Sequence, residues 1–234
     1  MQDPGRPGPD VEHRGPTGRP ELAELSDDIR SRLGDVNAAR EAGLAACRRT
    51  IRSAGSAIRA VHRRQAEDVD RHLAECEHAL RGAQDALSPF PAVAYAGFLH
   101  DAEKEFSEAV LTKALVAGAP LPSASELGVG LPAWLNGLAE AASELRRHLL
   151  DRLRGGDSAV AEDLLAAMED VYELLAGVDF PDAVTGGLRR TNDALRAVLE
   201  RSRSDLTTTL LQQRLQAALE ANLPAGSPAR PPSS

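Results

Sequence analysis

Apolar residues recur at helical spacing along most of the chain. Between 20 and 61 they fall three or four residues apart, or at sums of these spacings, as on a helix with one buried face. This stripe consists of Leu22, Leu25, Ile29, Leu33, Val36, Leu44, Cys47, Ile51, Ile58 and Val61. It predicts one helix of about forty residues that starts near Pro20. The mean helix in globular proteins has only ~11 to 12 residues. A helix this long needs partners along its length, from the same chain or from another copy.

Five further segments have the same periodicity and are separated by proline or glycine. They are 66–87, 92–117, 131–154, 158–176 and 182–222. Ser123 and Glu126 have capping-box spacing and predict a short capped turn, and Asp157 can cap the helix that follows it. Gly186-Gly187 can interrupt the last helix near its start. With no strand pattern, the sequence predicts an all-α fold: a single-domain bundle of about six to seven helices with long first and last helices.

The composition agrees with this fold class. Of the 234 residues, 42% are hydrophobic but only 3% are aromatic, so the interior consists mainly of Leu, Ala and Val, which suit close helix packing. Residues 1–19 and 223–234 are rich in proline, which cannot continue a helix or complete a strand ladder. We therefore expect two disordered tails on either side of a helical domain at 20–222.

Charge and cysteine content narrow the classes of function. The formal net charge of −8 argues against a surface that binds nucleic acid throughout, although a local basic patch can still do so. Cys47 and Cys76 lack metal-ligand spacing and are expected to be reduced core thiols. No apolar run is long enough to span a bilayer or to form the apolar region of a signal peptide. These features predict a cytoplasmic protein without a membrane partner.

The segment 100–109 is the most informative for function. It sets Asp101, Glu105 and Glu108 at i, i+4 and i+7, on one side of a helix. On a helical wheel Glu105 falls inside an apolar arc, and the other two acids sit at its edge. This arc consists of Phe98, Ala102, Phe106 and Ala109. A carboxylate directed at a core needs a cation, a hydrogen-bond network, a raised pKa or a bound metal.

A second acidic pair, Glu140 and Glu144, lies at i and i+4 of a later helix. Two interpretations are open. In the first, both pairs are salt-bridged surface acids, with Lys104 beside the first pair and Arg147 or His148 beside Glu144. In the second, the two helices pack side by side and four carboxylates converge. Such a set prefers Mg²⁺ or Mn²⁺, and two such ions can promote phosphodiester cleavage.

Basic residues gather in the later part of the first predicted helix. Arg48, Arg52, Arg59 and Arg63 share one face there. They are either a solvated face that pairs with the acidic surface, or a surface that grips phosphates. Because aromatic residues are few, nucleic-acid binding by this face should be weakly sequence-selective and strongly salt-dependent.

Several segments together resemble the translin family, and its Trax branch more than translin itself. The strongest similarity lies in Glu-Phe-Ser-Glu-Ala at 105–109 and in the segment from Trp134 to Arg147. Other matching segments occur in the family's order at 36–41, 48–52, 57–62 and 188–196. The resemblance covers nearly all of 25–210, and its specificity lies in the order and spacing of motifs that are individually weak.

The resemblance implies an all-α fold of about seven helices that assembles into hollow octamers and binds single-stranded RNA and DNA. In the Trax branch a carboxylate cluster binds Mg²⁺ and cuts single-stranded RNA. Carried over, the catalytic and metal-binding residues are Glu105, Glu108, Glu140 and Glu144. Asp101, which shares a helix side with the first pair, is expected to be an acid next to this set. Arg48, Arg52, Arg59 and Arg63 are the expected nucleic-acid-binding residues. This sequence departs from the family pattern in having Phe106 for Tyr, Glu140 for Asp and Ser143 for Gly.

The leading hypothesis is a translin-family homo-oligomer, an octamer by resemblance, that cleaves single-stranded RNA with Mg²⁺ or Mn²⁺. The first alternative is an oligomeric scaffold that binds RNA or DNA without catalysis, in which the acids are structural. The second is a helical partner-binding module that binds no nucleic acid.

Overall fold

The computed structural model describes residues 19–222. Within this range the chain forms six long helices and three helices of one turn, and no strand. The elements are α1 (Pro20–His62), α2 (Ala66–Leu87), α3 (Pro91–Ala94), α4 (Phe98–Ala117), α5 (Ala124–Leu127), α6 (Leu131–Arg154), α7 (Ser158–Ala176), α8 (Asp182–Thr185) and α9 (Leu188–Ala221). The all-α class with long first and last helices is confirmed. The predicted tails, apart from Arg19, lie outside the described residues.

Several helix ends follow the predicted local signals. Pro20 occupies the first turn of α1. At α5 the Ser123 side chain accepts from the Glu126 backbone N–H, and the Glu126 side chain accepts in return from the Ser123 N–H, which is the predicted capping box. The Asp157 side chain accepts from the Val160 N–H and begins α7. These side chains satisfy backbone donors that a helix start leaves without partners.

One predicted boundary is wrong. The helix expected over 92–117 is broken, because α3 ends at Ala94 and α4 begins only at Phe98. Gly97 precedes α4 with φ of 100°, a conformation that a residue with a Cβ rarely adopts. The predicted interruption of the last helix does occur, since Gly186 and Gly187 have φ of 63° and 82° between α8 and α9.

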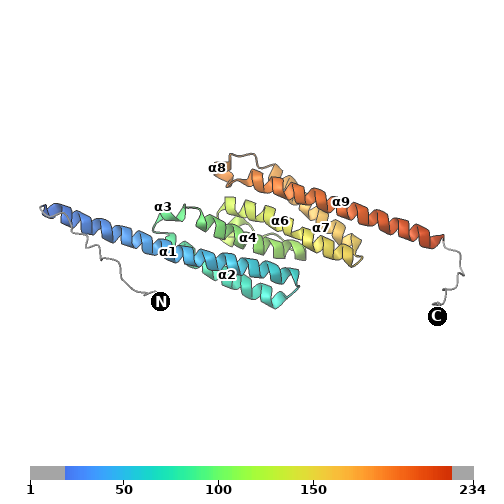
Figure 1. Cartoon of the computed structure of the whole chain (residues 1–234), viewed down its shortest axis with the longest axis horizontal. Helices are drawn as coiled ribbons and strands as arrows, with labels where there is room; N and C mark the ends of the chain where they lie inside the picture. Colours follow the sequence, from blue (N-terminus) through green and yellow to red (C-terminus); the bar gives the residue numbers. More distant parts are fainter. Residues whose placement is uncertain (1–18, 223–234) are drawn as a thin grey trace, which may run out of the picture.

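The long helices are arranged in three layers (Figure 1). The pair α1 and α2 packs against α4, α4 packs against α6, and α6 packs against α7 and α9. The core between α6, α7 and α9 is built mainly from leucines, whereas the core between α1, α2 and α4 consists largely of alanines with Cys47, Cys76 and Phe106. Both cysteines are free and buried, as predicted. No helix in 19–222 is long and apolar enough to cross a membrane.

Two helix arms extend beyond the layers. Figure 1 shows the first part of α1 and the last part of α9 extending at opposite ends of the structure. Their apolar residues are exposed: Leu22, Leu25, Ile29 and Leu33 on α1, and Leu211, Leu215 and Leu219 on α9. Within the described residues these stripes have no covering partner. The expectation that the first helix has partners along its whole length, from the same chain or from another copy, therefore remains a prediction for its first part.

The helices α4 and α6 approach each other backbone to backbone at Gly137. A Cβ added to Gly137 would lie 2.7 Å from the Ser107 Cβ, 2.8 Å from the Lys104 carbonyl oxygen and 3.0 Å from the Glu108 nitrogen. Only glycine permits this approach. Because Glu140 follows one turn later on α6, the contact brings its side chain to the acidic residues of α4.

We predict that Gly137→Ala lowers the free energy of unfolding by about 1 to 3 kcal/mol, since the clash involves backbone atoms that cannot rotate away. Thermal or urea denaturation followed by circular dichroism measures this. Gly82→Ala is the matched control: Gly82 lies inside α2 with nothing within 4 Å of an added Cβ, so the change should stabilise by about 0.4 to 1 kcal/mol. Equal effects of the two substitutions would contradict the close approach.

Candidate functional site

Three carboxylates from two helices meet at the α4–α6 contact. Glu105 and Glu108 of α4 and Glu140 of α6 each offer one oxygen, and these oxygens all lie within 4.8 Å of one another. Glu108 is buried, with 9% of its surface exposed, and the other two are partly buried. The structure therefore brings together three of the four carboxylates that the sequence singled out.

The most buried acid is Glu108, which corrects the helical-wheel expectation for Glu105. Burial, followed by the charges of Glu140, Glu105 and Glu144, raises the pKa of Glu108 from 4.5 to about 8. The charge of Lys104 opposes this shift without cancelling it. A carboxyl group held in this way is protonated at neutral pH unless a further cation approaches it.

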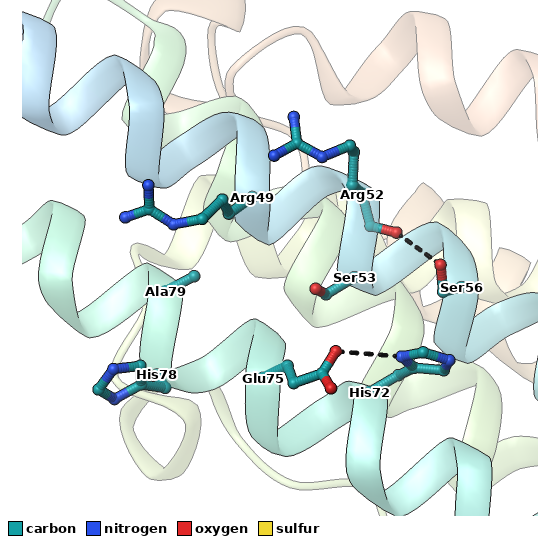
Figure 2. Close-up of a pocket in the computed structure, with 8 residues that line it drawn as sticks. All are labelled: Arg49, Arg52, Ser53, Ser56, His72, Glu75, His78 and Ala79. Atoms are coloured by element: carbon teal, nitrogen blue, oxygen red, sulfur yellow. Dashed lines mark hydrogen bonds and ion pairs between the residues drawn. The ribbon is translucent and has the colours of Figure 1, made fainter.

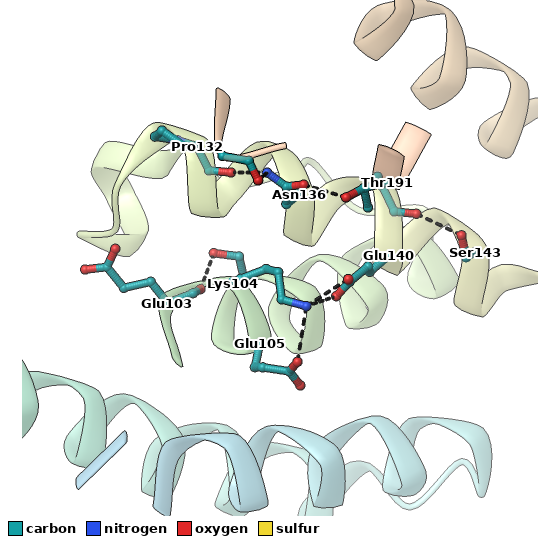
Figure 3. Close-up of polar contacts among 11 residues, drawn as sticks. Glu103, Lys104, Glu105, Pro132, Asn136, Glu140, Ser143 and Thr191 are labelled. Carbon is teal, nitrogen blue, oxygen red and sulfur yellow. Dashed lines mark hydrogen bonds and ion pairs between the residues drawn. The ribbon is translucent and has the colours of Figure 1, made fainter. Parts of the chain in front are cut away.

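Lys104 inserts its ammonium group between carboxylates of the cluster (Figure 3). Its Nζ lies 2.6 Å and 2.8 Å from the two oxygens of Glu140 and 3.3 Å from Glu105 Oε1. Burial alone would lower the pKa of Lys104, but the hydrogen bond and charge of Glu140 outweigh it, so this pKa is raised and the ammonium stays charged. The sequence placed Lys104 beside the first acidic pair but gave no sign that it reaches Glu140, 36 residues away.

Glu144 is held apart from this cluster by a histidine of α1. His62 Nε2 lies 2.6 Å from Glu144 Oε2, and His62 Nδ1 lies 3.1 Å from His148 Nε2. A carboxylate can only accept, so the Nε2–H of His62 donates to Glu144, while the direction of the His62–His148 hydrogen bond depends on the tautomers of the two rings. The predicted pairing of Glu144 with Arg147 or His148 is wrong, because His62 takes that place.

Both histidines of this chain of contacts are buried. The His62 side chain is 5% exposed and His148 is 6% exposed. Burial, followed by the charge of His62, lowers the pKa of His148 to about 4, so His148 is neutral under ordinary conditions. The hydrogen bond from His62 holds the pKa of Glu144 below its usual range although burial opposes this. Glu144 is therefore an ionised acid with one oxygen committed to His62.

The remaining sequence-predicted residues lie on exposed surfaces. Asp101 is exposed and is not part of the carboxylate cluster. The four predicted arginines are all exposed: Arg48, Arg52 and Arg59 on α1, and Arg63 directly after its end. None of the four forms an ion pair within residues 19–222, in contrast to arginines on α6 and α9 that pair with acids. Their positive charge is therefore not neutralised by this surface.

One face of α1 forms an open groove with α2 (Figure 2). The groove has a volume of about 350 Å³, and its lining includes Arg49 and Arg52 from α1 and His72, Glu75 and His78 from α2. His72 Nδ1 lies 3.2 Å from a Glu75 oxygen, so that acid is partnered within its own helix. The groove adds Arg49 to the arginines that the sequence indicated.

One turn before Glu140, Asn136 ties α6 to α8 and α9. Its Nδ2 donates to the Pro132 and Thr185 carbonyl oxygens, at 2.8 Å and 2.9 Å, and its Oδ1 accepts from Thr191 at 2.6 Å (Figure 3). Because Asn136 is buried beside Gly137, these bonds fix the rotation of α6 at the level of the cluster. The helix that carries Glu140 is thus held by α8 and α9 as well as by α4.

The protein is thus an all-α bundle with a candidate site for a divalent cation between two of its helices. No protein-family model matches the chain. It is similar to the crystal structure of AfC3PO, with 32% identity and a TM-score of 0.73 over 80% of this chain and 98% of that one. It is similar to the same protein in a complex with duplex RNA, with 31% identity and a TM-score of 0.72 over 80% and 97%.

C3PO is the complex of translin and Trax, and identity at this level over nearly the whole of the related chain is decisive: the chain belongs to the translin family. Apo-NeC3PO shares the fold, with a TM-score of 0.71 at 18% identity over 83% of this chain and 100% of that one. An uncharacterized protein of Methanocaldococcus jannaschii, MJ0175, is 28% identical over 186 residues, which are 79% of this chain and 82% of that protein.

We predict that Glu108→Gln stabilises the protein at alkaline pH when measured in EDTA. Because the folded pKa is raised, the contribution of Glu108 to stability is fully present below pH 4.5 and is lost as the pH rises to about 8. Glutamine has no proton to lose, so the variant should gain a few kcal/mol at pH 8 to 9, at ~1.4 kcal/mol per pKa unit.

Urea denaturation at a series of pH values measures this difference. Glu162→Gln, at an exposed position of α7, is the control and should show no such dependence. A Glu108→Gln stability difference that does not change between pH 4 and pH 9 would contradict the raised pKa.

Proposed function

We propose that this protein binds single-stranded nucleic acid and is a Mg²⁺- or Mn²⁺-dependent endoribonuclease of the Trax type. The observation that carries the proposal is the convergence of Glu105, Glu108 and Glu140, one of them buried with a pKa raised to about 8. Keeping like charges together in a partly buried position is costly, and such an arrangement is typical of sites that bind a cation.

The donor set fits a hard divalent cation. All three ligands are carboxylate oxygens, with no thiol or imidazole in the cluster, which favours Mg²⁺ or Mn²⁺ over softer metals. Two ligands of one Mg²⁺ at ~2.1 Å lie at most ~4.2 Å apart, so oxygens within 4.8 Å need only a small side-chain movement. Glu140, which stands where the family has Asp, reaches the cluster with its longer side chain because Gly137 brings α6 close.

Bound there, the cation would polarise a phosphate and lower the pKa of a water molecule. The residues of the chain supply the rest. Glu105, Glu108 and Glu140 hold the cation, and Glu144, ionised and oriented by His62, is the fourth acid at the edge of the site and can accept a proton from water through its free oxygen. Asp101 is exposed and lies outside the group of three carboxylates.

The unpaired arginines of α1 are proposed to hold the sugar–phosphate backbone. Arg59 and Arg63 lie on either side of His62 in the sequence, at the end of α1 that contacts the acidic site, and Arg48 and Arg52 continue the same face. Guanidinium groups without carboxylate partners are free to bind phosphates. AfC3PO has been solved with duplex RNA, and that relative supports RNA as the polymer. Single-stranded RNA, or single-stranded DNA, is the form that the family resemblance implies.

Self-association into a homo-oligomer, an octamer by family resemblance, is the proposed assembly. The support from this chain is the pair of helix arms, which expose apolar stripes that a monomer leaves in water. We place the protein in the cytoplasm, where its two free cysteines remain reduced.

The alternative is an oligomeric scaffold that binds RNA or DNA without cutting it. One observation favours this alternative: Lys104 contacts both Glu140 and Glu105 at 2.6 to 3.3 Å, so the two acids share a counter-ion from the chain itself. In that case the cluster would stabilise the α4–α6 contact and have no catalytic role.

We predict that the double variant Glu105→Gln with Glu140→Gln reduces cleavage of a labelled single-stranded RNA in Mg²⁺ or Mn²⁺ by at least ~100-fold, because two of three metal ligands are lost. Helicity and assembly should be unchanged. The control is Glu162→Gln with Glu173→Gln, which removes two charges from the exposed face of α7 and should cleave normally. Full cleavage by the cluster variant would exclude this active site, and RNA binding without cleavage by the wild type would support the scaffold.

We predict that Leu25→Asp with Leu33→Asp shifts the assembly to a smaller species, because charges on the apolar stripe of α1 oppose its burial. Size-exclusion chromatography with light scattering measures the mass. Ser31→Asp introduces a charge on the same arm outside the stripe and is the control. An unchanged mass in the leucine variant would show that this stripe is not part of the interface.

A further inference from the structure

The chain contains only two lysines. Lys104 and Lys113 stand against 25 arginines among the 27 basic residues. Both lie on α4, but their surroundings differ. Lys113 pairs with Asp70 at 2.6 Å where both side chains are about half exposed or more, whereas Lys104 has 21% of its side chain exposed and contacts two carboxylates of the cluster.

The Lys104 ammonium occupies the place where a cation would be shared by the two helices. It contacts both oxygens of Glu140, from α6, and one oxygen of Glu105, from α4. A metal ion coordinated by the same oxygens at ~2.1 Å would place its double positive charge close to the ammonium group, and the two cations would repel each other. The two cations therefore compete for the same carboxylates.

We propose that Lys104 is an internal competitor for the divalent cation, which must displace the lysine from Glu140 and Glu105 in order to bind. The inference rests on the proposed function only in so far as the cluster binds a cation. It adds that the apparent affinity for the metal is set by the fraction of molecules in which Lys104 has left the carboxylates.

The choice of lysine suits this role. Arginine holds carboxylates through a rigid planar fork, whereas the ammonium of lysine is a compact charge on a flexible four-carbon chain. With part of its side chain at the surface, Lys104 can swing its ammonium into water while its methylene groups stay packed. In the absence of metal the lysine balances the acids at the α4–α6 contact, and when it leaves it remains tethered next to the site.

The first test compares Mn²⁺ binding, followed by the loss of the free-ion signal in electron paramagnetic resonance, in three variants. Lys104→Met should bind Mn²⁺ at least ~10-fold more tightly than the wild type, since the competitor is gone. Lys104→Arg should bind more weakly, since the fork holds the carboxylates longer. Lys113→Met, which removes the same charge from the same helix, should bind like the wild type. Lys104→Gln repeats the test if the methionine variant folds poorly.

The second test follows the lysine itself. Protein labelled with ¹³C only in lysine gives two sets of side-chain signals, which the two lysine variants assign. Addition of diamagnetic Mg²⁺ should shift the Lys104 Cε signal toward that of a solvated lysine and leave Lys113 unchanged. This readout separates displacement from a general effect of charge on affinity, and it does not depend on RNA cleavage.

Three results would overturn the proposal. If Lys104→Met binds Mn²⁺ no more tightly than the wild type, Lys104 is not a competitor although the metal site stands. If it binds more tightly but the Lys104 signal of the wild type does not move with saturating Mg²⁺, only charge is at work. If neither the wild type nor Lys104→Met binds Mn²⁺, the metal site and the competition both fail.

Discussion

The close approach of α4 and α6 at Gly137 is the constraint on which the candidate site depends. The two helices are in direct backbone contact there, without a layer of side chains between them. The acids that follow on each helix are therefore brought close together. The buried Asn136 of α6 binds α8 and α9, and Glu140, one turn later, joins the carboxylates of α4. A larger residue at 137 would separate the same acids into two ordinary helix faces.

The charges at the α4–α6 contact are only partly balanced, because several acids share one lysine. The cluster contains three acids. Their negative charge is reduced by the ammonium group of Lys104 and by the raised pKa of Glu108, which favours its protonated form. Glu144 differs from these acids, because the hydrogen bond from His62 keeps it ionised. The site thus combines acids whose protonation and partners differ although their residue type is the same, which is how one kind of side chain can serve distinct roles.

The periodicity of the sequence was enough to place the long helices, the capping box at Ser123 and the break at Gly186-Gly187, since these depend on neighbours in the chain. It missed the break at Gly97, because Phe98 continues the apolar spacing on both sides of it. It also misjudged which acid is buried, since a wheel drawn from α4 alone cannot show that Glu108 faces α6. The contacts of His62 with Glu144 and of Lys104 with Glu140 join residues 82 and 36 positions apart. Helical periodicity relates only residues within one helix, so it cannot predict such contacts.

The length of α1 connects two distant parts of the structure. It is one uninterrupted helix of 43 residues, and it carries the exposed leucines at one end and His62 at the other. From Leu33 to His62 the axis runs for about 44 Å at 1.5 Å per residue. Over this length a tilt of the helix axis by one degree at Leu33 moves His62 by about 0.8 Å. Such a displacement is large compared with the tolerance of the 2.6 Å hydrogen bond between His62 and Glu144. In the proposed assembly, the angle at which a neighbouring subunit holds this arm would therefore also affect the contact between His62 and Glu144.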